Sequence, residues 1–203
     1  IPNLEAAVIN QTLEVKPDAD GEERKLQADV VLELDMKLYQ EEDHEVIMDV
    51  YTPFRQCMPK GRKEILESLL VRNFSRCRIA DRIEVKETQG KILQICHSQG
   101  KIKIDKIQIV KDGILAEGIV RLKVLYIIEN DEMPFYSMEA MLPFSHVVEA
   151  KGITENSVYY LHTDLEQLST TMVDSNDIEI RATIGLNVLV IQCSEEMIFE
   201  KIE

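Results

Sequence analysis

Residues 28–39 read Ala-Asp-Val-Val-Leu-Glu-Leu-Asp-Met-Lys-Leu-Tyr, and apolar side chains recur in this stretch at every second position. Successive side chains of an extended strand point to opposite faces, so this period places one apolar set on a single face. That set is Val30, Leu32, Leu34, Met36 and Leu38. The intervening positions, from Val31 to Tyr39, are mostly polar. The stretch therefore predicts a strand with one face directed at a core.

A second alternating stretch, residues 101–110, reads Lys-Ile-Lys-Ile-Asp-Lys-Ile-Gln-Ile-Val. The alternation is interrupted where Asp105 and Lys106 stand together, after which isoleucine continues in the other phase. A shift by one residue inside an alternating stretch is typical of a β-bulge. A break between two separate strands fits the same pattern, and the sequence leaves both interpretations open.

Turn-forming residues separate the alternating stretches. They occupy residues 17–21, 40–44, 111–113, 129–131 and 174–177. Asp112-Gly113 is a strong hairpin signal, because both residues tolerate the positive φ that tight hairpins need. The last predicted strand runs over 178–193, and its nearly continuous apolar part, 186–191, is typical of a strand buried on both faces. We therefore expect an all-β fold of antiparallel strands, as curved sheets or small sandwiches.

One segment follows a different period. Within 62–73 the apolar residues Ile65, Leu66, Leu69 and Leu70 recur at helical spacing, after the Pro-Lys-Gly sequence at 59–61. This spacing predicts one short helix near 62–73.

Two halves of the chain resemble each other when they are offset by 90 residues. Laid on 118–144, residues 28–54 give six identities, and both segments end in Pro-Phe, at 53–54 and at 143–144. The apolar positions also coincide, for example Leu32 with Leu122 and Met36 with Tyr126. We therefore predict two related β units, residues 1–90 and 91–203.

Composition and charge narrow the range of functions. The chain has 203 residues, with 37 acidic and 23 basic side chains and a net charge of −14. Such a surface disfavours binding to nucleic acids and to anionic membranes. No apolar stretch approaches the roughly 20 residues that span a bilayer, so we expect no membrane insertion. The basic residues gather in one part of the chain, namely Lys60, Arg62, Lys63, Arg72, Arg76, Arg78 and Arg82. We interpret them as a solvated face.

Residues suited to catalysis are present but poorly arranged. Ser145-His146 and Cys96-His97 are neighbours in sequence, yet adjacent residues of a strand point to opposite faces, so neither pair forms a natural dyad. We interpret Cys96 as a small buried apolar group and His146 as an ordinary strand residue. Phosphate-binding glycine motifs and a nucleophile elbow are absent from the sequence. We therefore expect no enzyme activity, no catalytic residues and no cofactor, and the sequence assigns no binding residue.

The sequence predicts neither a metal site nor a disulfide. The cysteines Cys57, Cys77, Cys96 and Cys193 form no CxxC pair, and we expect reduced thiols. The acidic stretches 18–23 and 174–177 lack the spacing of a calcium loop, and we interpret them as ordinary turns.

The stretch 112–126, Asp-Gly-Ile-Leu-Ala-Glu-Gly-Ile-Val-Arg-Leu-Lys-Val-Leu-Tyr, resembles the core of the SPOCS domain. The Pro-Phe-Ser-His sequence at 143–146 and the Ile-Glu-Ile-Arg-Ala sequence at 178–182 are similar to the same family. Residues 69–77 are similar to the divergent copy that precedes this domain in tandem members. The family is β-rich, comes from spore-forming bacteria and is often followed by a LysM module. No LysM pattern occurs up to Glu203.

The resemblance implies a non-enzymatic scaffold or adaptor in spore coat or spore envelope assembly, acting through protein–protein contacts. It implies a location in the mother-cell cytoplasm at the forespore surface, and a coat morphogenetic ATPase as a partner. Self-association is a further expectation. The association with LysM suggests a second function, a module that binds cell-envelope carbohydrate related to peptidoglycan.

Overall fold

The computed structural model describes residues 2–40, 42–47, 49, 51, 53–54, 59–85 and 91–202. The strands are β1 (Pro2–Pro17), β2 (Glu23–Leu38), β3 (Pro59–Glu84), β4 (Ile92–Val110), β5 (Gly113–Ile128), β6 (Phe135–Glu149), β7 (Val158–Met172) and β8 (Asp177–Ile202). All pairing is antiparallel, and the described residues contain no helix. The predicted all-β fold is confirmed.

The chain divides by its internal contacts into two compact units, residues 1–45 and 46–203. The first unit holds the β1–β2 hairpin, and the second holds β3 to β8. This division differs from the boundary near residue 90 that the repeat suggested, because β3 lies before that boundary yet pairs with β8. The assignment of 1–90 and 91–203 as two SPOCS-like domains stays a prediction.

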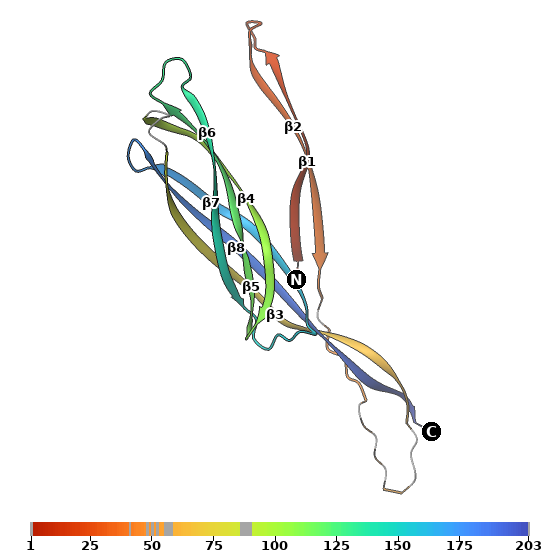
Figure 1. The fold of residues 1–203 in the computed structure, drawn as a ribbon. Coiled ribbons are helices and arrows are strands. Elements are labelled where there is room, and N and C mark those ends of the chain that lie inside the picture. Colours follow the sequence, from red (N-terminus) through yellow and green to blue (C-terminus); the bar gives the residue numbers. More distant parts are fainter. Residues whose placement is uncertain are drawn as a thin grey trace. The chain divides into compact units, whose positions relative to one another are not determined.

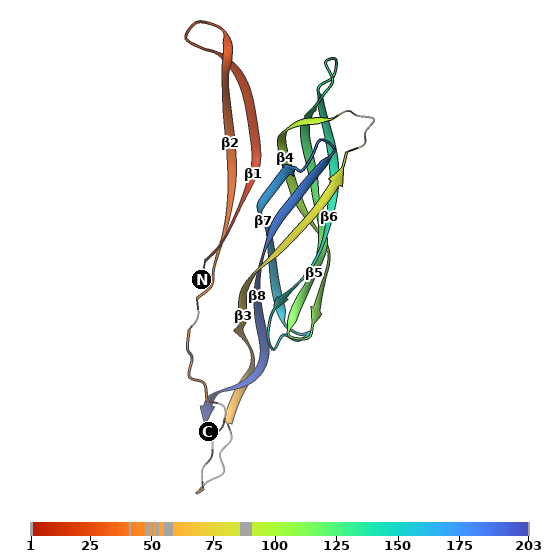
Figure 2. The ribbon, with the colours of Figure 1, turned by 90° about the vertical axis from the view of Figure 1, so that its left-hand side faces the viewer.

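The second unit consists of two three-stranded sheets, with strand orders β3-β8-β7 and β4-β5-β6 (Figures 1 and 2). The sheets meet at both edges, where β4 contacts β7 and β3 contacts β6. Each sheet directs one face toward the other, as alternating apolar and polar strands require. The unit is therefore a small antiparallel sandwich.

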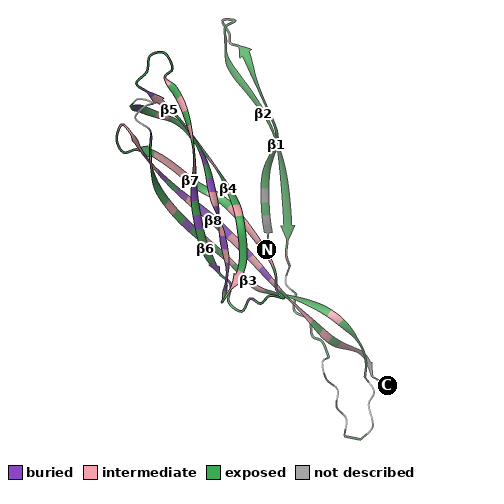
Figure 3. Cartoon of the chain, in the orientation of Figure 1, coloured by how far each residue is buried: buried purple, intermediate pink, exposed green. Residues whose placement is uncertain are grey.

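The core of the sandwich comes mainly from the two central strands. Alternate residues of β5 and β8 are buried, visible as the purple bands in Figure 3. Those with 2% exposure or less are Ile114, Ala116, Val120, Leu122, Val124, Tyr126, Ile128, Ile178, Ile180, Ile184, Leu186, Val188 and Val190. The apolar stretch 186–191 belongs to β8, and its alternate residues Leu186, Val188 and Val190 are buried whereas the residues between them are half-buried. The strand is therefore fully buried on one face and not, as predicted, on both. Burial of this apolar set is the main source of stability for the unit.

The predicted bulge at Asp105 is confirmed. In the β4–β5 ladder, Ile104 pairs with Gly118 and Lys106 with Glu117, so Asp105 is the additional residue and β4 continues through it. The alternative of two separate strands is wrong. Asp112 adopts a φ of 54° between β4 and β5, which confirms the predicted hairpin turn.

The predicted helix near 62–73 is wrong, because these residues form part of β3. They pair with β8, from Arg62 opposite Ile198 to Asn73 opposite Val188. A register shift between Leu69 and Val71 changes which residues face inward. This shift placed the apolar residues at a spacing that imitates a helix, and cross-strand pairing outweighs such weak local preferences.

The first unit is a hairpin of two 16-residue strands, β1 and β2. Asp18 closes the turn, because its Oδ1 accepts the backbone N–H groups of Asp20 at 2.9 Å and Glu22 at 3.0 Å, while Gly21 has a φ of 83°. The bounds of β2, 23 and 38, coincide with those of β5, 113 and 128, when 90 is added. In the 90-residue repeat, the β1–β2 hairpin is therefore the counterpart of the β4–β5 hairpin of the sandwich. Met48, another matched position, lies outside the described residues.

Candidate functional site

The largest exposed apolar surface of a described strand pair lies on one side of the β1–β2 hairpin. The pairing places its residues on one face, from Leu4 opposite Met36 to Val15 opposite Leu26. We call this set the hairpin face; it comprises Leu4, Ala6, Val8, Leu13, Val15, Leu26, Ala28, Val30, Leu32, Leu34, Met36 and Leu38. Every member is exposed, and Figure 3 shows the described parts of both strands in the colour for exposed residues. Contiguous apolar surfaces of this extent mark interaction sites.

The repeat shows how unusual this exposure is. Val30, Leu32, Leu34, Met36 and Leu38 are between 52% and 70% exposed. Their counterparts 90 residues later are at most 2% exposed, because they fill the sandwich core. Those counterparts are Val120, Leu122, Val124, Tyr126 and Ile128. The hairpin face is therefore a core-type surface that its own unit leaves uncovered.

The other side of the hairpin is polar. Ala7 pairs with Glu33, Thr12 with Asp29 and Glu14 with Gln27, so polar groups predominate along this side. Two exposed apolar residues on this side are Val31, opposite Asn10, and Ala7, opposite Glu33, and Ile9 is the exposed additional residue at the register shift between Val8 and Asn10. The hairpin thus has one side suited to contact and one suited to water.

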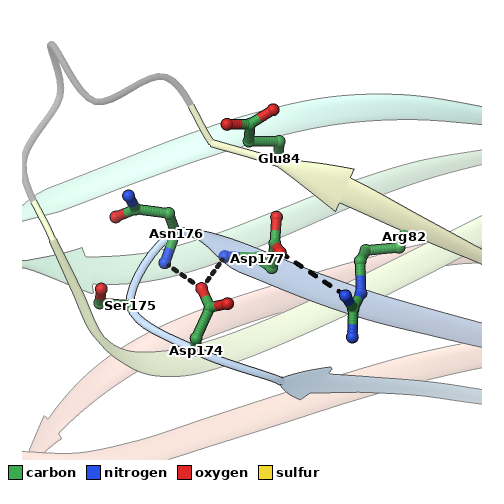
Figure 4. Close-up of a pocket in the computed structure, with 6 residues that line it drawn as sticks. All are labelled: Arg82, Glu84, Asp174, Ser175, Asn176 and Asp177. Atoms are coloured by element: carbon green, nitrogen blue, oxygen red, sulfur yellow. Dashed lines mark hydrogen bonds and ion pairs between the residues drawn. The ribbon is translucent and has the colours of Figure 1, made fainter.

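A polar depression of about 640 Å³ lies at the end of the sandwich, beside the turn between β7 and β8 (Figure 4). It is lined by Arg82, Glu84, Asp174, Ser175, Asn176 and Asp177. Asp174 Oδ1 accepts the backbone N–H groups of Asn176 at 2.8 Å and Asp177 at 2.9 Å. These hydrogen bonds, the one from Asn176 first, lower the pKa of Asp174 below its usual value. Its carboxylate therefore serves to shape the turn, as the sequence predicted for 174–177.

A serine–histidine pair joins the edges of the two sheets. Ser75 on β3 and His146 on β6 lie 2.6 Å apart, Oγ to Nε2, in a partly buried position. Asn73, two residues before Ser75, donates from Nδ2 to the backbone oxygen of Glu149 at 2.9 Å. Catalysis by such a pair also needs an orienting group and oxyanion donors around a cavity. Neither residue lines the polar depression, and we interpret the pair as a link between β3 and β6.

This link predicts a measurable contribution to stability. Ser75→Ala removes one hydrogen-bond partner of a partly buried histidine and should lower the free energy of unfolding by about 1 kcal/mol. The matched control is Ser145→Ala, since Ser145 makes only an exposed, 3.4 Å hydrogen bond to Glu117. Urea denaturation of both variants measures the difference. Equal effects of the two substitutions would contradict the structural role of the pair.

The structure does not bring Ser145 and His146 together as a pair. Ser145 bonds to Glu117, whereas His146 bonds to Ser75, so the two residues serve different partners. His146 is a strand residue, as expected. Cys96 is exposed rather than buried, because it is the additional residue between Ile95 and His97 in the ladder with β5. The prediction of a buried Cys96 is wrong, and the reason is this second bulge in β4.

The buried thiol belongs instead to Cys77, where burial raises the pKa. Cys77, Cys96 and Cys193 are free cysteines in the structure. Cys57 lies outside the described residues.

The basic residues of 60–82 all lie on β3, and several are close to acids. Arg76 binds Glu166 through Nε at 2.7 Å, and this contact raises the pKa of Arg76. Lys63 lies 2.6 Å from Glu195 and Arg82 3.8 Å from Asp177, Nζ and Nη1 to carboxylate oxygen. These basic residues therefore form a solvated face of the strand β3, and no helix contributes to this face.

Two further features concern the part of the chain that the structure describes. It holds no group of three or more histidine, cysteine or acidic residues arranged to bind a metal ion. No helix there is long and apolar enough to cross a membrane.

Comparison with known proteins gives one match. No curated protein and no solved structure matches the chain significantly. The family model described as SipL, SPOCS domain, matches residues 91–173. The match extends from the residue before β4 to the residue after β7, and so includes β5 with its buried face. This confirms the resemblance for 112–126 and 143–146. Residues 91–173 of this protein are thus similar to the SPOCS domain family.

Proposed function

We propose that the protein is a non-enzymatic scaffold or adaptor in assembly of the spore coat or spore envelope, and that it acts by binding other proteins. The match of residues 91–173 to the SPOCS domain described for SipL carries this proposal. The match relates the protein to sporulation, and a scaffold role is what the family resemblance implies.

The surfaces of the protein support a binding role over a catalytic one. The polar depression beside the β7–β8 turn has its central carboxylate engaged by backbone N–H groups. The hairpin face, in contrast, presents ten large apolar side chains that are each more than half exposed. Interaction surfaces of proteins have this character, whereas substrate sites are concave and contain convergent polar groups.

The partner and the compartment follow from the same proposal. A coat morphogenetic ATPase is the protein partner that we propose, with the complex located at the forespore surface in the mother-cell cytoplasm. With a net charge of −14, nucleic acids and anionic membranes are poor alternatives as binding partners.

Localisation in sporulating cells tests the proposal. The full chain, fused to a fluorescent protein and produced in the mother cell, should collect around the forespore, whereas an unrelated acidic β protein with the same fusion should stay diffuse. A diffuse signal from both fusions would contradict the scaffold role. Binding of purified muropeptides by the chain, together with a diffuse signal, would favour the carbohydrate-binding alternative.

A further inference from the structure

We propose that the hairpin face binds the same face of a second copy of this chain, so that two β1–β2 hairpins pack face to face in a homodimer. The inference goes beyond the proposed scaffold role and does not depend on it, since it rests on the geometry and exposure of the hairpin and on its comparison with the sandwich.

The extent of the hairpin face fits a dimer. Ten of its members are large apolar residues, from Val30 at 52% exposure to Leu38 at 70%. Together they expose on the order of 1,000 Å² per copy, compared with the roughly 800 Å² that each partner contributes to a stable interface. An isolated two-stranded hairpin is at best marginally stable in water, so covering this face also stabilises the hairpin itself.

The repeat indicates what kind of surface should cover the hairpin face. The equivalent face of β4–β5 is covered by the apolar face of a second sheet, β3-β8-β7. That sheet is itself occupied, because its β8 residues from Ile178 to Val190 are buried under β4-β5-β6. A second hairpin face offers the missing kind of surface, an apolar sheet of the same width and length. A two-fold axis through the face pairs mostly apolar residues with apolar residues, and Gln11, opposite Val30, is the polar residue among them.

The polar side of the hairpin limits the assembly to two layers. Asp29, Glu33 and Asp35 lie on that side, so a third hairpin would have to bury carboxylates. Residues 1–45 contain 13 acidic and 4 basic side chains, and two such hairpins repel each other. Salt screens this repulsion while leaving apolar contact intact. The dissociation constant of the dimer should therefore fall as sodium chloride is added. A complex held together by opposite charges would show the reverse.

Sedimentation velocity of the full chain over a wide concentration range tests the inference. The unchanged chain should dimerise reversibly, with a dissociation constant that falls as salt is added. Leu32→Asp places a carboxylate in the middle of the hairpin face and should raise the dissociation constant by more than about tenfold. Val31→Asp is the matched control, because it adds the same charge one residue away on the polar side, and it should raise the constant far less.

A second substitution guards against local unfolding of the hairpin. Leu32→Ser removes the apolar contact without adding a charge, and circular dichroism shows whether both variants keep the strand content of the unchanged chain. Two results would overturn the inference: a monomer at every concentration, or a dimer that Leu32→Asp and Val31→Asp weaken to the same extent. Because these measurements use purified protein, they are independent of where the chain localises in the cell.

Discussion

Leu122→Ala should lower the free energy of unfolding of the sandwich by about 3 kcal/mol, within the range seen for leucine truncation in a rigid core. Leu122 is 2% exposed in the central strand β5, between Gly100 on β4 and Ala140 on β6. Its Cδ2 lies above Gly100, which has no side chain that could move into the space of the lost atoms. The surrounding atoms therefore cannot easily fill the cavity. The free energy of unfolding falls both because the buried methyl groups are lost and because an empty cavity remains.

The matched control for this substitution is Leu125→Ala. Leu125 lies on the same strand but on its outer face and is 37% exposed, so its truncation should cost less than about 1 kcal/mol. Chemical denaturation followed by tyrosine fluorescence and circular dichroism measures both values. Similar costs for the two leucines would contradict the assignment of the inner and outer faces of β5.

Gly118→Ala should destabilise the protein by about 3 kcal/mol, although it adds only a methyl group. A Cβ at Gly118 would lie 2.3 Å from the backbone oxygen of Lys103 and 3.1 Å from the Cα of Ile104. These are backbone atoms next to the bulge at Asp105, so they cannot yield by a change of rotamer. Relief requires a shift of β4 against β5 and costs ladder hydrogen bonds.

Gly100→Ala is the corresponding control in β4. Its Cβ would meet the Cδ2 atoms of Leu165, Leu122 and Leu168, which are the ends of flexible side chains. Their adjustment is partly offset by the lower backbone entropy of alanine in the unfolded chain, so we expect a net cost of about 1 kcal/mol. Thermal unfolding of both variants gives the comparison. A larger cost at Gly100 than at Gly118 would show that the bulge does not hold β4 close to β5.

Much of the fold follows from the sequence because strand alternation and turn residues act locally. The period of 28–39 places Leu32 and Leu34 on one face, and Asp112-Gly113 forms the turn that its dihedral preferences favour. The bulge at Asp105 can also be recognised in the sequence, because the alternation of apolar residues shifts by one position there. The predicted helix near 62–73 is wrong because a bulge in β3, between Leu69 and Val71, produces an apolar spacing that fits both a helix and a strand.

The polar pair could not be predicted from sequence. Ser75 and His146 lie 71 residues apart on different sheets, and they meet only because β3 and β6 are the edges that come together. The sequence suggests neighbours such as Ser145 and His146 as pairs, but adjacent residues of a strand point to opposite faces. A signal for the true pair would require the order of the strands in both sheets, and that order depends on long-range pairing.

The hairpin and the sandwich show that the same pattern can have different outcomes. Leu32 and Leu122 occupy equivalent positions in the repeat, yet the first is 56% exposed and the second 2%. Alternation predicts that a face is apolar, but it does not specify which surface covers that face. In β5 the covering surface is β8 of the same unit, and for the hairpin face we propose a second copy.

Amide hydrogen exchange of the full chain, measured by mass spectrometry over a range of protein concentrations, tests most directly whether the β1–β2 hairpin lacks a covering layer within its own chain. Amides of β5 should be strongly protected at every concentration, since β5 lies between β4 and β6 in the sandwich. Amides of β1 and β2 should exchange rapidly in dilute protein and become protected as the concentration rises. Protection of residues 23–38 that equals that of 113–128 and does not change with concentration would contradict the account.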